Sequence, residues 1–400
     1  MLAEFETRHY SLTRQRLSAT ASLDYRFTET SEIQFTGTYT EHEDTEQRRR
    51  MVHVLEDGEM EFNHKNRLET LSIASGSLDG NHLLGAVQLD WGASFARAGE
   101  DTPYDTEMIF AQEDVTFAPD ISVPTRVLPN PTSPGAYDGT YDFDAIEPGS
   151  SETFDTNLGG YFDLEIPYQL GSVASGGLKF GFLVRDKSKD QNVEEFAYEL
   201  ADGDLTLDEI AEIFDDFKDF QPGSEYDFSP ISTTPEQVEF FVDDRRDELE
   251  EERNVEADTE DFDLNERVIA GYVMTELNLT DRLMILPGIR YEYTDYTGDG
   301  FSFDPDTETL TPTTQENSYG NVFPHVHARY RIAQRTNLRA AYSTAIARPN
   351  YFDLIPYRIR DDEDRELGNP ELDPTTANNF DLLIEHYDQR IGVLSAGVFY

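Results

Sequence analysis

The sequence contains no cysteine and no long apolar run. Without cysteine the chain can form no disulfide framework, no cysteine-ligated zinc site and no thiol nucleophile. A membrane-spanning helix needs roughly 20 consecutive apolar residues, and no stretch of the 400 residues approaches that length. A strand that spans a membrane needs only about 9–11 residues, of which alternate ones face lipid. The absence of an apolar run therefore excludes a helical membrane protein and leaves a β-barrel open.

Basic residues are scarce relative to acidic ones. The chain has 31 Lys and Arg against 81 Asp and Glu, which gives a formal net charge of −50. This excess argues against nucleic-acid binding, because phosphate contacts need a basic surface. Two stretches hold most of the acidity: residues 186–266 carry 30 acidic and 6 basic residues, and residues 100–155 carry 13 and 1.

Catalytic signatures are also missing. The sequence has no nucleophile elbow, phosphate-binding glycine loop or catalytic histidine cluster, so we expect neither an enzyme nor a bound cofactor. His325 and His327 lie two apart on a predicted strand and could share a metal, but no third ligand is placed beside them. We interpret them as polar residues that face a lumen.

The stretch that ends at Glu209 resembles the second half of an EF-hand loop, with Gly203 at the sixth position. Tyr198 and Leu200, however, occupy the positions of the first two carboxylate ligands. We therefore interpret this stretch as an acidic, capped surface helix. Weak calcium binding by the whole acidic stretch stays open.

Alternation of apolar and polar residues is the main structural signal. It runs through residues 17–27 and, after a short polar turn, through residues 33–40. Period two on both sides of a turn predicts a β-hairpin. The pattern recurs along the chain, which predicts about twelve strands. The further strands are expected near residues 66–77, 82–97, 157–170, 177–186, 266–280, 282–294, 322–333, 337–346, 376–388 and 391–400.

The connections between these strands are unequal in length. Residues 28–31 and 280–281 form tight turns, whereas residues 98–156 and 187–265 are very long connections, with helices predicted to begin at Thr206 and Thr234 in the second. Such asymmetry is typical of transmembrane barrels, which have short periplasmic turns and long extracellular loops. The sequence predicts an all-β protein, an antiparallel transmembrane barrel with long acidic extracellular loops.

The segment 337–388 is the most specific part of the sequence. A strand ends in Ser343-Thr344-Ala345-Ile346-Ala347-Arg348-Pro349, followed by Gly368-Asn369-Pro370-Glu371-Leu372-Asp373-Pro374 and then by a strand that contains Asn379, Asp381 and Glu385. This order and spacing resemble a motif from the middle of the barrel in TonB-dependent receptors. Residues Asn321-Val322-Phe323-Pro324, which lead into the preceding strand, fit the same family. Within this motif we expect Arg348, Pro349, Gly368, Asn369 and Pro370 to shape the strand–loop–strand unit rather than to perform chemistry.

The resemblance implies an outer-membrane receptor of bacteria that takes up a scarce nutrient, such as a siderophore or an oligosaccharide, without catalysis. Its implied partners are outer-membrane lipid, a small-molecule or oligosaccharide substrate and the TonB energy-coupling complex, and it is expected to be a monomer. The family also has an N-terminal plug, a TonB box and more strands than the twelve seen here. We therefore expect residues 1–400 to be a partial barrel domain whose natural start lies upstream of Met1.

Two alternative functions stay open from the sequence alone. A passive, porin-like channel would have the same strands but no plug and no energy coupling. A soluble, acidic β-protein such as a lectin would have a two-sided core and no aromatic girdles. The acidic loops disfavour an anionic ferric siderophore unless cations screen them, and a neutral oligosaccharide fits better.

Overall fold

The computed structural model describes residues 4–120, 128–132, 141–171, 174–202, 205–207, 212–213, 231–232, 235–304, 307, 309–355, 357–360 and 365–400. A single large antiparallel sheet dominates this part of the chain. Its twelve main strands follow one another in the order of the sequence. They are β1 (Glu4–Thr28), β2 (Ser31–Val54), β3 (Glu59–Leu84), β4 (Val87–Gln112), β7 (Asp142–Leu170), β8 (Ala174–Leu200), β12 (Phe262–Thr280), β13 (Leu283–Asp304), β14 (Thr309–Ala333), β15 (Thr336–Ala347), β18 (Thr375–Asp388) and β19 (Gly392–Phe399).

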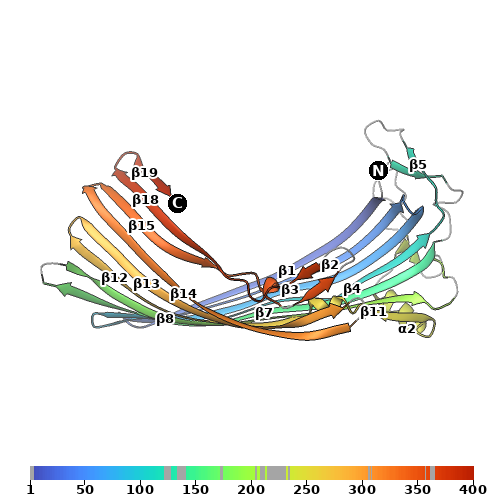
Figure 1. The fold of residues 1–400 in the computed structure, drawn as a ribbon, viewed down its shortest axis with the longest axis horizontal. Coiled ribbons are helices and arrows are strands. Elements are labelled where there is room, and N and C mark those ends of the chain that lie inside the picture. The colour runs from blue at the N-terminus through green and yellow to red at the C-terminus, as the bar shows by residue number, and fades with distance from the viewer. Residues whose placement is uncertain are drawn as a thin grey trace.

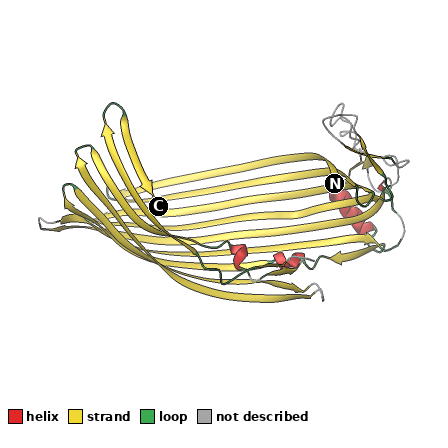
Figure 2. Cartoon of the chain, turned by 45° about the horizontal axis from the view of Figure 1, so that its top comes forward, coloured by secondary structure: helices red, strands yellow, loops and turns green. Residues whose placement is uncertain are grey.

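The sheet is curved into an open trough, with β1 and β19 at its two edges (Figure 1). Figure 2 shows the same trough from a second direction, with long strands running along its length. The short elements are β5 (Phe117–Asp120), β6 (Leu128–Pro131), β9 (Glu212–Ile213), β10 (Ile231–Ser232), α2 (Pro235–Asp244), β11 (Leu249–Arg253), η2 (Ala257–Glu260), α3 (Tyr351–Leu354), β16 (Arg358–Arg360) and β17 (Arg365–Leu367). Among the described residues, no helix combines the length and apolarity that a membrane crossing requires. The prediction of an antiparallel barrel sheet of about twelve strands is confirmed.

The convex face of the sheet carries a continuous apolar belt. Residues directly opposite one another on neighbouring strands share a face, and the register joins Phe35 through Leu78 and Ala93 to Ile269 and Tyr293. Large apolar side chains of this belt are between 37% and 44% exposed, far more than a soluble core would allow. The exposed side chains near this row are Phe35, Leu78, Phe162, Phe182, Ile269 and Tyr293.

The concave face is polar at the same level. Thr36 and Thr38 lie on it, as do Asp163 and Tyr272, whose hydroxyl donates to Asp163 at 2.6 Å. Lipid on one side and water on the other account for this division, since each strand alternates between them. The two faces place the membrane around the outside of the trough and the lumen within it.

Two sequence predictions about strand ends were wrong. The strand predicted over residues 82–97 is interrupted by the turn at Gly85 and Ala86, where Gly85 adopts a φ of +68°. That turn contains no polar residue, so the hydropathy pattern hides it. In the stretches 98–156 and 187–265, strands continue to Gln112 and Leu200 and resume before the predicted positions, so the connections are shorter than expected.

The connections differ in length between the two ends of the sheet. At one end lie the tight turns at residues 29–30, 85–86, 281–282 and 334–335, as the sequence predicted for two of them. At the other end the chain makes its long excursions over residues 113–141, 201–261 and 348–374. By the usual asymmetry of outer-membrane barrels, the tight turns face the periplasm and the excursions face the exterior.

The exterior ends of β2, β3, β4 and β7 carry a hydrophobic cap on the convex side. Phe62, Phe110 and Phe143 lie in one cross-strand row and are buried there, together with Phe241 of α2. The helix predicted to start at Thr234 is therefore present as α2, and the chain turns into β11 at Leu249. The helix predicted after Thr206 falls largely outside the described residues.

Two adjacent residues of β2 can test which face of the sheet meets lipid. Phe35 points to the lipid side and Gln34 to the lumen. An arginine in lipid costs about 2–4 kcal/mol near the membrane midplane, so Phe35→Arg should lower the free energy of unfolding in bilayer vesicles by that amount. Gln34→Arg should leave it nearly unchanged. Equal losses for both variants, measured by urea titration, would refute the assignment of the faces.

Protonation of His64 should loosen the hydrophobic cap, which lies well outside the belt. Burial and the nearby Arg49 lower the pKa of His64 to about 3, whereas an unfolded histidine has a pKa of about 6.5. Between these values the unfolded state binds more protons than the folded state. The contribution of His64 to the free energy of unfolding is therefore fully present above about pH 6.5 and falls by up to about 1.4 kcal/mol per pH unit below it.

Amide hydrogen exchange over residues 59–64, corrected for intrinsic rates, should therefore become faster between about pH 7 and about pH 5. His64→Gln should reduce this dependence without removing it, because burial also lowers the pKa of His9 and His53. Exchange that stays constant over this range would contradict the prediction.

Candidate functional site

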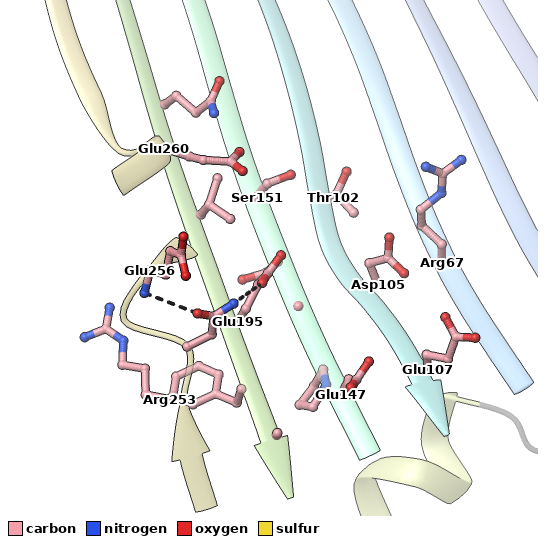
Figure 3. A pocket seen from close by; sticks show the side chains of 18 of the residues that line it. Arg67, Thr102, Asp105, Glu107, Glu147, Ser151, Glu195, Arg253, Glu256 and Glu260 are labelled. Carbon is pink, nitrogen blue, oxygen red and sulfur yellow. Dashed lines mark hydrogen bonds between the residues drawn. The ribbon is translucent and has the colours of Figure 1, made fainter. Parts of the chain in front are cut away.

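A cavity of about 900 Å³ lies on the concave wall above the apolar belt. Its floor is formed by the exterior halves of β3, β4, β7 and β8, and one side by residues 252–256 and Glu260. Figure 3 shows side chains from all four strands pointing into this space, with Glu256 and Glu260 beside Glu195. The strands run far past the roughly 9–11 residues needed in lipid, which is why the wall of the cavity stands outside the membrane.

The cavity is strongly acidic. Nine carboxylates line it against the three cations Lys65, Arg67 and Arg253, a difference of six negative charges. The cations already have partners, for example Lys65 with Asp105 at 2.7 Å and Arg253 with Glu194 at 2.9 Å. Within the described residues, six of the carboxylates have no cation within 4.0 Å. They are Glu100, Glu147, Glu195, Glu252, Glu256 and Glu260.

Glu147 shows the electrostatic consequence of this crowding. It lies directly across from Glu107, and it is far outside the apolar belt. Partial desolvation, together with the charges of Glu107, Asp144 and Glu195, raises the pKa of Glu147. Its carboxylate therefore disfavours any further negative charge in the cavity.

Polar groups that can bind uncharged ligands surround these carboxylates. Thr102, Ser151, Thr153 and Gln191 line the cavity, and the Asn254 amide donates to Glu195 at 2.8 Å. Hydroxyl, amide and carboxylate groups together can donate to and accept from a hydroxyl-rich ligand. The lining contains few apolar side chains, among them Phe196 and Phe303.

The loop after β15 folds back into the trough and is held by buried charges. Arg348 donates to Glu292 at 2.7 Å and to the Thr294 hydroxyl at 3.1 Å. Glu266, only 3% exposed, accepts from Arg185 and from the Tyr351 hydroxyl, each at 3.1 Å. A buried carboxylate is stable only when it is paired and hydrogen-bonded, and this loop completes those contacts.

The Gly368-Asn369-Pro370 turn docks the rest of the loop. A Cβ added to Gly368 would lie 1.7 Å from the Ile355 carbonyl oxygen, so only glycine fits there. The amide of Asn369 donates to the Asp353 carbonyl at 2.7 Å, and the Pro370 carbonyl accepts from Tyr296 and Asn317. Beneath the loop lies a second hydrophobic cluster, which contains Phe262, Leu264, Tyr296, Leu354, Ile355 and Tyr357.

The matches to known proteins agree with this architecture. Residues 229–400 match the outer membrane protein beta-barrel family. The fold is similar to that of the ferric-catecholate import receptor Fiu from E. coli K12 in its closed form. That match has a TM-score of 0.51 at 10% identity and covers 98% of this chain and 57% of Fiu. Its fold is that of a TonB-dependent receptor barrel.

A further similar structure is the siderophore receptor PiuA from Acinetobacter baumannii, with a TM-score of 0.46 and 12% identity over 100% of this chain and 57% of PiuA. The chain thus spans less than two thirds of the length of either receptor. No sequence among curated proteins matches it significantly. The match to the outer membrane family and this barrel fold place the chain in the bacterial outer membrane.

The receptor barrel places the histidines of the sequence analysis on the lumen wall. His325 and His327 share the concave face, with ring centroids 5.9 Å apart, and both line a cavity of about 450 Å³. Within the described residues, no group of three or more His, Asp or Glu side chains is arranged to hold a metal. Much of the EF-hand-like stretch, Gly203 included, lies outside those residues.

Sequence reasoning missed the acidic cavity and Glu266. The residues of the cavity come mainly from four strands and from a segment that begins more than fifty residues after the last of them, and each charged one looks like an ordinary polar strand residue. The alternation of β12 did place Glu266 on the same face as Leu264 and Val268. A carboxylate between apolar residues on one face of a strand is the signal that could have drawn attention to it.

Removal of the Arg348 side chain should release the inner loop. Arg348→Ala leaves Glu266 and Glu292 without one of their cations, and breaking a buried pair costs about 3 kcal/mol. We expect faster hydrogen exchange over residues 348–355 and 365–374. The control is Arg267→Ala, which removes an exposed pair with Asp186 on the convex face and should cost at most about 1 kcal/mol. Unchanged exchange in the Arg348 variant would show that the charges do not hold the loop.

Proposed function

We propose that this receptor barrel takes up a scarce nutrient across the outer membrane, driven by the TonB complex, and that residues 1–400 act as one barrel domain. The cargo first binds in the acidic cavity on the lumen wall. The observation that carries this proposal is the position of that cavity: it opens inside the trough, on strands that extend beyond the membrane. A ligand held there is already on the path toward the lumen.

The charge of the cavity favours a neutral, hydroxyl-rich cargo such as an oligosaccharide. Six excess negative charges repel an anionic ligand, and the field is strongest in a concave site with low-dielectric walls. Fiu is described as an import receptor for ferric catecholates, but an anionic iron chelate would enter this cavity only with cations that screen Glu100, Glu147 and their neighbours. Carboxylates and amides instead form good hydrogen bonds with sugar hydroxyls.

Two observations weigh against the alternatives from the sequence. The exposed apolar belt, with Phe35 and Phe182 on the convex side, disfavours a soluble β-protein. The loop after β15 folds into the trough and is held to its wall by Arg348 and Tyr351, which disfavours a passive, open channel. Energy coupling through a TonB box and binding as a monomer complete the proposal.

Uptake by cells tests the energy coupling. A strain that expresses the full-length receptor should accumulate labelled short maltodextrins, and a strain without tonB or with a dissipated proton gradient should not. A passive channel would transport equally in both backgrounds, which would exclude active import. A ferric catecholate complex serves as the second probe.

The charge variant separates the two cargo classes. Glu147→Gln combined with Glu100→Gln removes two of the unpaired charges in the cavity, so it should raise affinity for the ferric complex severalfold at low salt. Glu316→Gln, which removes a negative charge outside the lining, is the control. If the ferric complex is imported well by the unmodified receptor and the maltodextrins are not, the cargo assignment is wrong although the uptake function stands.

A further inference from the structure

Three arginines line a third cavity, of about 380 Å³, at the tight-turn end of the lumen. Arg282, Arg329 and Arg331 line it, and Asp281 is the one acidic residue in the lining. The chain has 81 acidic residues for 31 basic ones, so a basic cavity is contrary to its overall composition.

The register shows that this cavity lies on the inner wall. Gln169, Ser175, Asn278, Met284 and Arg329 are successive partners across β7, β8, β12, β13 and β14. They share the face of the lumen, opposite to the lipid-facing belt. The cavity therefore opens to the lumen near the periplasmic rim, at the opposite end from the acidic cavity.

Backbone hydrogen bonds place these arginine residues beside one another at the tight-turn end of the sheet. The amide of Arg331 donates to the Arg282 carbonyl at 2.8 Å, and the Thr280 hydroxyl accepts from the amides of Arg282 and Leu283 at 3.2 Å and 3.0 Å. Arg329 is half-buried on the neighbouring strand face. The turn at residues 281–282 thus brings the backbones of Arg282 and Arg331 together, and the side chains of both are exposed.

Within the described part of the chain, no carboxylate oxygen lies within 4.0 Å of Arg282, Arg329 or Arg331. Arg339, which lies directly across from Arg329, differs in having a carboxylate partner: it pairs with Glu385 at 2.7 Å. Three like charges around one cavity repel one another unless an anion joins them.

We propose that this cavity binds a phosphate group. Guanidinium groups form paired, charge-assisted hydrogen bonds with phosphate oxygens, and three of them match the charge of a phosphate better than that of a single carboxylate. Gln169, Ser175 and Asn278 supply further amide and hydroxyl groups in the same cavity. The phosphate can belong to a phospholipid headgroup at the rim or to a soluble phosphate in the periplasm.

Titration with inorganic phosphate tests the site in the full-length receptor, purified in detergent and freed of lipid. We expect saturable binding that weakens about tenfold in Arg329→Gln and in Arg331→Gln. Arg329→Lys should give a smaller loss, since it keeps the charge but not the paired donors. The matched control is Arg335→Gln, which removes an exposed charge at the same end of the sheet but outside the lining.

Lipid extracts of the purified receptor distinguish the two sources. Phospholipid retained by the unmodified receptor and lost from the Arg331 variant would identify a headgroup, and binding of free phosphate without retained lipid would identify a soluble ligand. Absence of saturable phosphate binding would overturn the proposal. Equal weakening in the Arg335 control would do the same, because it would show nonspecific attraction to the basic rim. Neither result depends on what the receptor transports.

Discussion

The structure depends on one constraint: inside a bilayer every backbone N–H and C=O must find a partner within the protein. The unbroken pairing from β1 to β19 satisfies it strand by strand, except along the outer sides of these two edge strands. Pairing of this kind forces neighbouring side chains to alternate between lipid and lumen, so one face becomes apolar and the other polar. The belt through Phe35 and Ile269 and the polar wall through Asp163 are therefore two results of the same hydrogen-bond ladder.

Above the membrane the same ladder is free of that constraint. There the convex side can be covered by the chain itself, as at Phe62 and Phe143, and the concave side can gather charge, as at Glu107 and Glu147. Charges placed in the lipid-facing belt would each cost several kcal/mol. The two acidic stretches of the sequence accordingly contribute mainly to the exterior walls and loops, where water and ions solvate them.

The difference between the strand segments inside the membrane and those outside it explains which parts of the fold could be predicted from the sequence. All twelve main strands were found, because alternation is strict where one face meets lipid, as from Leu17 to Phe27. The strand ends beyond the membrane were missed, because polar residues on both faces remove the pattern, as in residues 98–112. The turn at Gly85 was missed for lack of polar residues. The motif around Arg348 and Gly368 was recognised from local order, but its partner Glu266 lies about eighty residues earlier. Only the register of the sheet brings the two together.

The buried network at Glu266 also limits how the lumen can change. Its carboxylate is shared by Arg185 on one strand, Tyr351 in the inner loop and, at 3.8 Å, Arg348. If the loop moved away while Glu266 kept its charge, a buried carboxylate would lose two of its partners and need water in their place. Movement of the loop and entry of water into the lumen must therefore occur together. A ligand that opens this path has to supply the energy of that exchange, whether by contacts in the acidic cavity or through force applied from the periplasm.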